Sequence, residues 1–279
     1  MRAPTSVYAS PRATRPERSH GPHVGARVAA TLNCMVLDGA VPTIPEGNGV
    51  LVVMAHPDDA EFGCGGTIAK WAAAGKHINY VLCTSGDKGS SDLATNTIEL
   101  AKQRRVEQIN AAHALGAHDV VFLAYEDGTL RNTLELRRDI VREIRRFRPD
   151  AVICQDPTMR FGGNRYLNHP DHRAAGDACL DAVYPSARDP HVFPELLVDN
   201  LMPHKVREVF MSTQQNPDVW IDIADCFHRK LDGLRQHTSQ VGERMEQVEK
   251  RIRERSAATA RQYGLPYELA EGFRYFRLD

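Results

Sequence analysis

Several features that mark specialised classes of protein are missing from this 279-residue sequence. The net charge is −1, so the charge balance gives no reason to expect binding to nucleic acid or to a membrane surface. No apolar run approaches the ~18 residues that a membrane-spanning helix needs. What remains is an ordinary globular composition, with 42% hydrophobic and 25% charged residues.

The six cysteines form no recognisable redox or metal-binding pattern. They lie at positions 34, 64, 83, 154, 179 and 226, and no two of them make a Cys-x-x-Cys pair. Most fall in apolar runs, where a free cysteine behaves as a small buried hydrophobic residue. We therefore expect reduced thiols and a cytoplasmic protein.

Residues 1–34 differ in composition from the rest of the chain. They contain five arginines and one glutamate, and they show no hydrophobic periodicity, which is typical of disorder. Two alternatives stay open: an arginine-rich targeting leader, and a translation start at Met35. We predict that residues 1–45 are disordered and that residues 46–279 form a single domain.

From residue 48 onward, short apolar runs alternate with helical patterns. The predicted strands are residues 50–55, 78–83, 120–124, 151–154, 206–211 and 219–223. The predicted helices are residues 64–75, 95–115, 132–147, 172–183, 224–237 and 241–262, with a long loop at 185–205. This alternation predicts an α/β fold with a mostly parallel sheet covered by helices on both faces.

An apolar stripe of Val241, Met245, Val248 and Ile252 runs along the last predicted helix. Packing of this helix on the sheet is the ordinary interpretation of such a stripe. The alternative is contact with a second subunit, which would make the protein a homo-oligomer.

The strongest functional signal lies where the first predicted strand ends. Residues 50–55 run directly into His56-Pro57-Asp58-Asp59. Ligand sites of open α/β sheets form just past the carboxyl ends of strands. His56 and Asp59, three residues apart on a turn, suit zinc or a similar divalent ion and supply two of the three ligands typical of a catalytic site.

Asp58 is then free for a different task. A carboxylate beside a metal ion can take a proton from water, so Asp58 is a candidate general base. The ordinary alternative is that Asp58 or Asp59 caps the following helix. Two adjacent aspartates after His-Pro exceed what capping requires, which favours the catalytic interpretation.

Three glycines follow, Gly63, Gly65 and Gly66, with Cys64 among them. A dinucleotide-binding loop needs Gly-x-Gly-x-x-Gly directly after the strand, and the spacing here does not match it. We expect these glycines to let the helix start approach the sheet closely, and Cys64 to pack in the core.

A second cluster, His169-Pro170-Asp171-His172, follows the predicted strand at 151–154 after a loop. His172 is the expected third metal ligand. His169 suits an acid that protonates a leaving group or stabilises an oxyanion. Asp171 is expected to orient an imidazole and raise its basicity.

Together the two motifs resemble those of the PIG-L/LmbE-like deacetylases, over roughly residues 50–240. The matching segments are residues 55–59, 63–67, 84–89, 104–107, 111–112, 115–116, 127–128, 169–172, 221–223 and 237–240. The resemblance implies a Rossmann-like fold, a single LmbE-like domain, and a divalent ion, usually zinc, with Fe²⁺ as the other candidate. The roles it implies are metal binding by His56, Asp59 and His172, general-base catalysis by Asp58, assistance to the oxyanion and the leaving amine by His169, tuning of the histidine by Asp171, and substrate binding by Asp87 and Asp127.

Two positions depart from the family pattern. Asp87 stands where many members have glutamate. Some members have a tyrosine two residues before the first histidine of the second motif, where this sequence has Leu167, with Tyr166 one step earlier.

We predict a zinc-dependent amidohydrolase that removes an N-acyl group, acetyl in the family, from a small amino sugar or its glycoside. One alternative is a non-haem iron enzyme, because two histidines and one carboxylate also form its facial triad. That alternative leaves Asp58 and His169 without a role. The other is a non-catalytic sugar-binding protein with a vestigial site. An inositol glycoside, a chitin-type disaccharide and an antibiotic sugar are all candidate substrates.

Overall fold

The computed structural model describes residues 43–162, 164 and 166–278. The segment predicted to be disordered, residues 1–45, lies almost wholly outside the described residues, and that prediction stays untested. Within the described ranges, no helix combines the length and the apolarity needed to cross a bilayer.

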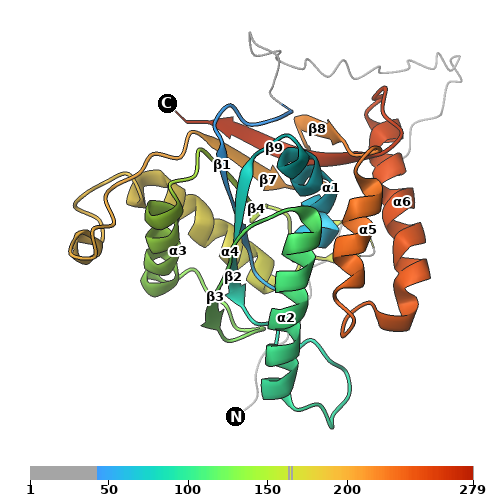
Figure 1. Cartoon of the computed structure of the whole chain (residues 1–279), viewed down its shortest axis with the longest axis horizontal. Helices are drawn as coiled ribbons and strands as arrows, with labels where there is room; N and C mark the ends of the chain where they lie inside the picture. The colour runs from blue at the N-terminus through green and yellow to red at the C-terminus, as the bar shows by residue number, and fades with distance from the viewer. Residues whose placement is uncertain (1–42, 163, 165, 279) are drawn as a thin grey trace, which may run out of the picture. The chain divides into compact units, whose positions relative to one another are not determined.

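A seven-stranded sheet forms the centre of the fold, in the order β3-β2-β1-β4-β7-β9-β8 (Figure 1). Its strands are β1 (Gly49–Met54), β2 (His77–Thr84), β3 (Val120–Tyr125), β4 (Ala151–Gln155), β7 (Glu208–Ser212), β8 (Val219–Asp222) and β9 (Ala270–Arg277). A separate small hairpin joins β5 (Phe161–Gly162) to β6 (Tyr166–Leu167). The main helices are α1 (Asp59–Ala73), α2 (Thr97–Leu115), α3 (Leu134–Phe147), α4 (Pro170–Asp181), α5 (Phe227–Arg235) and α6 (Met245–Gln262).

The sheet is mostly parallel, as the sequence predicts. β1, β2, β3, β4 and β7 pair in parallel, and β9 pairs antiparallel with both β7 and β8. β9 was not predicted from the sequence. Charged residues interrupt its sequence, and it inserts between β7 and β8 through pairing with strands far away in the chain.

Several predicted segments differ in detail from the structure. The last helix, predicted at 241–262, begins at Met245 after a 3-10 turn at Gly242–Arg244. The first helix begins at Asp59, five residues before the predicted 64–75, and its backbone is kinked at Cys64. The predicted loop at 185–205 contains a short 3-10 helix, Pro194–Leu197. The pattern located the apolar part of α1 and missed its polar first turn, which carries the site residues.

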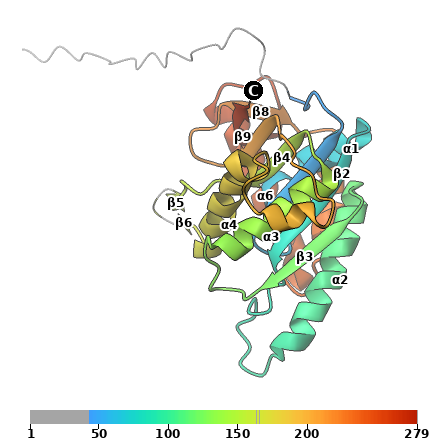
Figure 2. The ribbon, with the colours of Figure 1, turned by 90° about the vertical axis from the view of Figure 1, so that its left-hand side faces the viewer.

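Helices cover both faces of the sheet (Figures 1 and 2). On β1, Val50, Val52 and Met54 pack in a cluster with α1, α2 and α5, while Leu51 and Val53 pack in a second cluster with α3 and α4. Successive residues of a strand point to opposite faces, so β1 is buried on both sides. This burial explains why β1 reads as a continuous apolar run.

The apolar stripe of the last helix faces the core. Ile252 is buried in the first cluster, and Met245 and Val248 pack against that cluster. Packing of α6 on the body of the protein is therefore confirmed. Contact of this helix with a second subunit stays a prediction.

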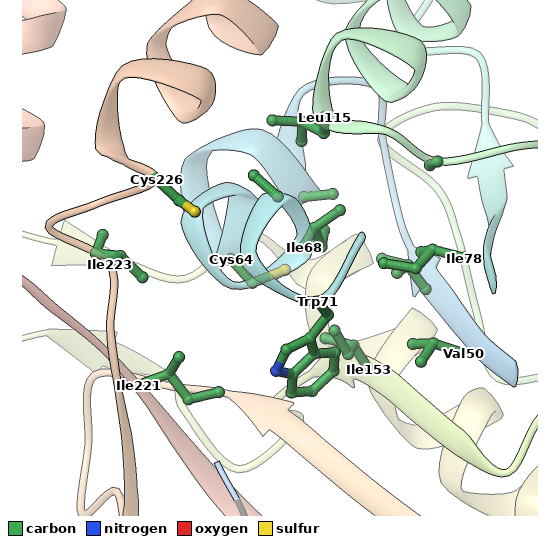
Figure 3. Packing of buried hydrophobic residues seen from close by; sticks show 14 of the residues in the cluster. Val50, Cys64, Ile68, Trp71, Ile78, Leu115, Ile153, Ile221, Ile223 and Cys226 are labelled. Atoms are coloured by element: carbon green, nitrogen blue, oxygen red, sulfur yellow. The ribbon is translucent and has the colours of Figure 1, made fainter. Parts of the chain in front are cut away.

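Trp71 is the largest fully buried side chain of the core, and it points from α1 toward Ile153 of β4 (Figure 3). Its ring lies 5.0 Å from that of Phe210, and its indole N–H donates to the carbonyl oxygen of Thr43 at 2.8 Å. We expect Trp71→Ala to lower the free energy of unfolding by ~3–5 kcal/mol, because it leaves a cavity and removes apolar contacts. Urea denaturation measures this change.

The matched control is Leu93→Ala, because Leu93 is fully exposed. It should change the free energy of unfolding by less than ~0.5 kcal/mol. Equal effects of the two substitutions would show that Trp71 does not pack as described.

Candidate metal centre and active site

The predicted site residues gather at the carboxyl ends of the central strands. His56 and Asp59 follow β1, His169 and His172 follow β4 after the small hairpin, and Asp127 follows β3. β1 pairs in parallel with β4, and β2 links it to β3, so these strand ends meet at one edge of the sheet.

The carboxylate of Asp59 lies between two imidazoles. Its Oδ2 is 3.3 Å from Nδ1 of His56, and its Oδ1 is 3.0 Å from Nε2 of His172. Gln155 Nε2 donates to Oδ2 at 3.0 Å, and the His56 backbone N–H donates to it at 2.8 Å. Burial opposes the charge, yet both histidines hold the pKa of Asp59 well below its usual value. The structure thus brings the three predicted ligands together.

Two further carboxylates hold the other nitrogen of His56. Nε2 lies 3.0 Å from Oδ1 of Asp127 and 3.2 Å from Oδ2 of Asp171. Burial works against a charged ring here, but hydrogen bonds to Asp127, Asp171 and Asp59 raise the pKa of His56 to about 12. Three carboxylates around one imidazole therefore make this position strongly favourable for positive charge.

Asp171 orients His56 from a rigid position. It is fully buried, and its oxygens accept the backbone N–H groups of Gly128 at 2.7 Å and Leu130 at 3.2 Å. The distance from Asp171 to Nδ1 of His169 is longer, 3.9 Å. The carboxylate thus lies closer to His56 than to the neighbouring His169.

Asn168 fixes the orientation of His172. Its Oδ1 accepts a hydrogen bond from Nδ1 of His172 at 3.0 Å, which places the proton on Nδ1 and leaves Nε2 available as a ligand. The hydroxyl of Tyr166 also donates to this oxygen at 3.1 Å, and Asn168 Nδ2 donates to the carbonyl oxygen of Met159 at 2.7 Å. Sequence reasoning missed Asn168. Its position beside His169 was the sole signal available.

We expect Asn168→Ala to weaken metal binding about 10–100-fold, the usual cost of losing a partner that orients a ligating histidine. Competition with a chelator measures the affinity. Asn168→Asp keeps an oxygen that accepts from His172 and should lose much less. Unchanged affinity in Asn168→Ala would contradict the role assigned to this residue.

His169 sits at the N-cap of α4. Its Nδ1 accepts the backbone N–H of Asp171 at 3.2 Å, so the neutral ring carries its proton on Nε2. Burial and the nearby charge of His56 lower its pKa. The side chain is 43% exposed, and its ring lies edge-on to that of His56, with centroids 4.8 Å apart. An Nε2–H donor is therefore available to a substrate.

Asp58 is held in a strained backbone conformation, with φ at 84°. Its side chain makes no capping hydrogen bond to α1, which argues against the capping interpretation. The backbone N–H of Asp58 donates to Oε1 of Gln108 at 2.9 Å. The guanidinium of Arg104 lies 3.3 Å from Oδ2 of Asp58 and also donates to the carbonyl oxygen of Pro57. Burial raises the pKa of Asp58 to about 7, against the opposing charge of Arg104.

A buried polar network lies behind Asp58, and sequence reasoning did not find it. Glu61 lies 3.1 Å from Nε2 of His237, and its other oxygen accepts from Gln108 at 3.0 Å and from Tyr80 at 3.3 Å. Glu61 and His237 are both fully buried. Gln108 thus connects this network to the backbone of Asp58. The one signal in the sequence was the family match at residues 237–240.

Two predicted binding residues occupy different surroundings. Asp127 contacts His56 and accepts the backbone N–H of Lys88 at 2.9 Å. Asp87 lines a separate pocket beside α2, and within the described ranges it is hydrogen-bonded to no other predicted site residue. Substrate binding by either aspartate stays a prediction.

The glycine-rich start of α1 has a packing role. A Cβ on Gly66 would lie 2.8 Å from Cβ of Ile223, so glycine is required for this close approach. Cys64 is fully buried in the first core cluster, and burial raises the pKa of its thiol well above the usual value. Both observations agree with a structural interpretation of this segment.

The donor atoms fit a divalent metal ion. Two groups of donors, each mutually within 4.8 Å, occur in the described part of the chain: His56 with His169 and His172, and His56 with Asp127 and Asp171. Imidazole nitrogens and carboxylate oxygens are ligands typical of zinc and similar ions.

Comparisons with known proteins agree with this site. The family model "PIG-L: GlcNAc-PI de-N-acetylase" matches residues 51–183. Diacetylchitobiose deacetylase of Thermococcus kodakarensis is 36% identical to this chain over 194 residues, which is 70% of each protein. The chain belongs to the PIG-L family.

Two further similar proteins extend the likeness. A solved structure of N,N'-diacetylchitobiose deacetylase from Pyrococcus horikoshii has a TM-score of 0.75 and 30% identity, and the match covers 83% of this chain and 85% of that one. A probable N-acetyl-α-D-glucosaminyl L-malate deacetylase of Bacillus cereus is 29% identical over 217 residues, 75% of this chain and 91% of its own. The predicted family and α/β fold are confirmed.

Proposed function

We propose that this PIG-L protein is a metal-dependent deacetylase that hydrolyses the N-acetyl group of an amino sugar or its glycoside. The products are a free amine and acetate. One observation carries the proposal: two acid/base groups accompany the cluster of His56, Asp59 and His172. Asp58 adjoins Asp59 in the chain, and the His169 ring lies 4.8 Å from that of His56. The names of the similar proteins support the same reaction class.

Three atoms would hold the ion: Nδ1 of His56, a carboxylate oxygen of Asp59 and Nε2 of His172. Zinc is the ion we propose. When bound, it supplies a Lewis acid that acidifies water and polarises the amide carbonyl. The protein prepares these ligands through Asp171 and Asp127 on His56 and through Asn168 on His172.

Asp58 takes the proton of the attacking water on its carboxylate. A pKa near 7 suits a general base at neutral pH, because the group is then substantially ionised and still basic. Arg104 and Gln108 hold the strained backbone of Asp58, so the carboxylate keeps a fixed position. Such pre-organisation avoids rearrangement during the reaction.

His169 donates from Nε2. It hydrogen-bonds the carbonyl oxygen through Nε2–H as negative charge develops there, and the ring stays neutral. An amide nitrogen must be protonated to leave as an amine, and the proton that Asp58 took from the water supplies this need.

We propose that the substrate is an N-acetylglucosamine glycoside, with Asp87 and Asp127 as hydroxyl-binding candidates. We further propose a cytoplasmic location. The five cysteines in the described ranges are all free and buried, which supports a reducing compartment.

A substrate panel tests the proposed function. N-acetylglucosamine, diacetylchitobiose, and the malate and inositol glycosides of N-acetylglucosamine are incubated with zinc-loaded protein, and released amine is quantified. We expect turnover of at least one glycoside. Binding of these sugars without amine release would instead favour a sugar-binding protein.

A further inference from the structure

A cavity of about 140 Å³ adjoins the proposed metal ligands. It lies over the half of the sheet that contains β4, β7 and β9. Asp59, His172 and Asn168 line the end nearest the metal ligands, and Arg255 of α6 lines it together with Lys230 and Glu271.

This cavity lies across the metal ligands from the proposed sugar-binding residues. Asp87 and Asp127 follow β2 and β3, on the opposite side of β1 from β4, β7 and β9. An amide is planar and almost always trans, so its nitrogen and carbon substituents extend in opposite directions from the scissile bond. With the sugar over β2 and β3, the acyl group points into the cavity.

Lys230 and Glu271 form an ion pair. Together they hydrogen-bond backbone groups on the two sides of the kink in α1. Glu271 accepts the backbone N–H groups of Gly66 at 3.0 Å and Thr67 at 2.8 Å, downstream of the kink. Lys230 lies 2.5 Å from Glu271 and donates to the carbonyl oxygen of Phe62, upstream of the kink, at 3.1 Å. These contacts give both side chains a structural role.

Arg255 is the cation of this lining that forms no ion pair with a carboxylate in the described residues. Its NH2 group donates to the carbonyl oxygen of Phe62 at 2.5 Å, and across the described ranges its other N–H groups have no acceptor. Asp156, the remaining acid of the lining apart from Asp59, is engaged by the backbone and hydroxyl of Thr158 at 2.8 and 2.6 Å. A guanidinium binds carboxylates with matched, charge-assisted hydrogen bonds.

We propose that this cavity is the acyl subsite, and that Arg255 lets it accept acyl groups longer than acetyl that end in a carboxylate, such as succinyl. The inference rests on the proposed deacetylase function and extends it to a further activity. Water adds across the amide, the C–N bond breaks, the nitrogen leaves as an amine with the transferred proton, and the acyl group leaves as a dicarboxylate.

The test compares N-acetyl-, N-butanoyl- and N-succinylglucosamine on the zinc-loaded full chain, with released amine as the readout. Butanoyl has the same number of carbons as succinyl and no charge. We expect kcat/KM for succinyl to exceed that for butanoyl by ~10-fold or more, the range of one charge-assisted hydrogen bond. Arg255→Gln should abolish this preference and change N-acetyl turnover less than about twofold.

Matched variants separate charge from position. Arg251→Gln removes an exposed charge from the same helix and should keep the preference for succinyl. Arg255→Lys keeps the charge and should retain part of it. Calorimetry with succinate gives a readout without turnover, and binding should be lost in Arg255→Gln.

Three results distinguish the possibilities. Succinyl hydrolysed no faster than butanoyl by the unmutated protein overturns the acyl subsite, whether or not Arg255→Gln folds. An equal fall for all three substrates in Arg255→Gln also overturns it. Absence of amine release from every sugar in both substrate panels overturns the proposed function itself, together with the inference built on it.

Discussion

Asp58→Asn is expected to lower kcat by ~10²–10⁴-fold while the metal stays bound. Asparagine keeps the shape of the side chain but cannot accept the proton of the attacking water. KM should change little if Asp58 acts chiefly in the transition state. Steady-state kinetics and elemental analysis of the same sample measure both parts of the prediction.

The control for Asp58→Asn is Asp225→Asn, because Asp225 is exposed and follows β8. It should leave kcat and metal content unchanged. A fall in kcat below ~10-fold would remove Asp58 from the role of general base. Loss of metal from Asp58→Asn would instead make it a ligand and exchange its role with that of Asp59.

His172→Ala is expected to empty the metal site and abolish turnover, with the fold intact. The imidazole supplies one of three proposed ligands, and its Nε2 lies 3.0 Å from the carboxylate of Asp59. Metal content should fall from about one ion per chain to a small fraction. Asp59→Ala should also lose metal affinity, and excess metal should partly restore its activity.

Elemental analysis and thermal melting together decide the outcome for His172→Ala. His228→Ala, an exposed histidine on α5, is the matched control and should keep its metal. Full metal occupancy in His172→Ala would refute the ligand assignment. Loss of the thermal unfolding transition in His172→Ala would show that His172 is needed for stability. The metal affinity of Asn168→Ala would then test the role of His172 as a ligand.

Central strands were predictable because they are buried on both faces. β1 and β4 read as apolar runs, and the predicted residues 50–55 and 151–154 nearly match the observed strands. β9 was not predictable in this way, because it contains Glu271 and three arginine or tyrosine positions whose partners lie elsewhere in the fold. The local pattern of a strand is lost where its side chains serve long-range polar contacts.

The site residues of the two motifs, 56–59 and 169–172, could also be predicted, because the residues within each motif are close in sequence. The contacts among them could not all be predicted. Asp127 and Asp171 were both predicted as site residues, but their meeting at His56 depends on the order of the strands, which spacing does not encode. Gln108 reaches Asp58 from the middle of α2, fifty residues along the chain. Such partners depend on packing and carry no local signal.

The central claim is that a metal ion held by His56, Asp59 and His172 makes this chain a deacetylase. Its most direct test is titration of metal-stripped protein with Zn²⁺ while acetate and free amine released from diacetylchitobiose are both measured. We expect no release without metal, activity that reaches a plateau at about one ion per chain, and acetate and amine in equal amounts. Full activity in the stripped protein, or amine release without acetate, would contradict it.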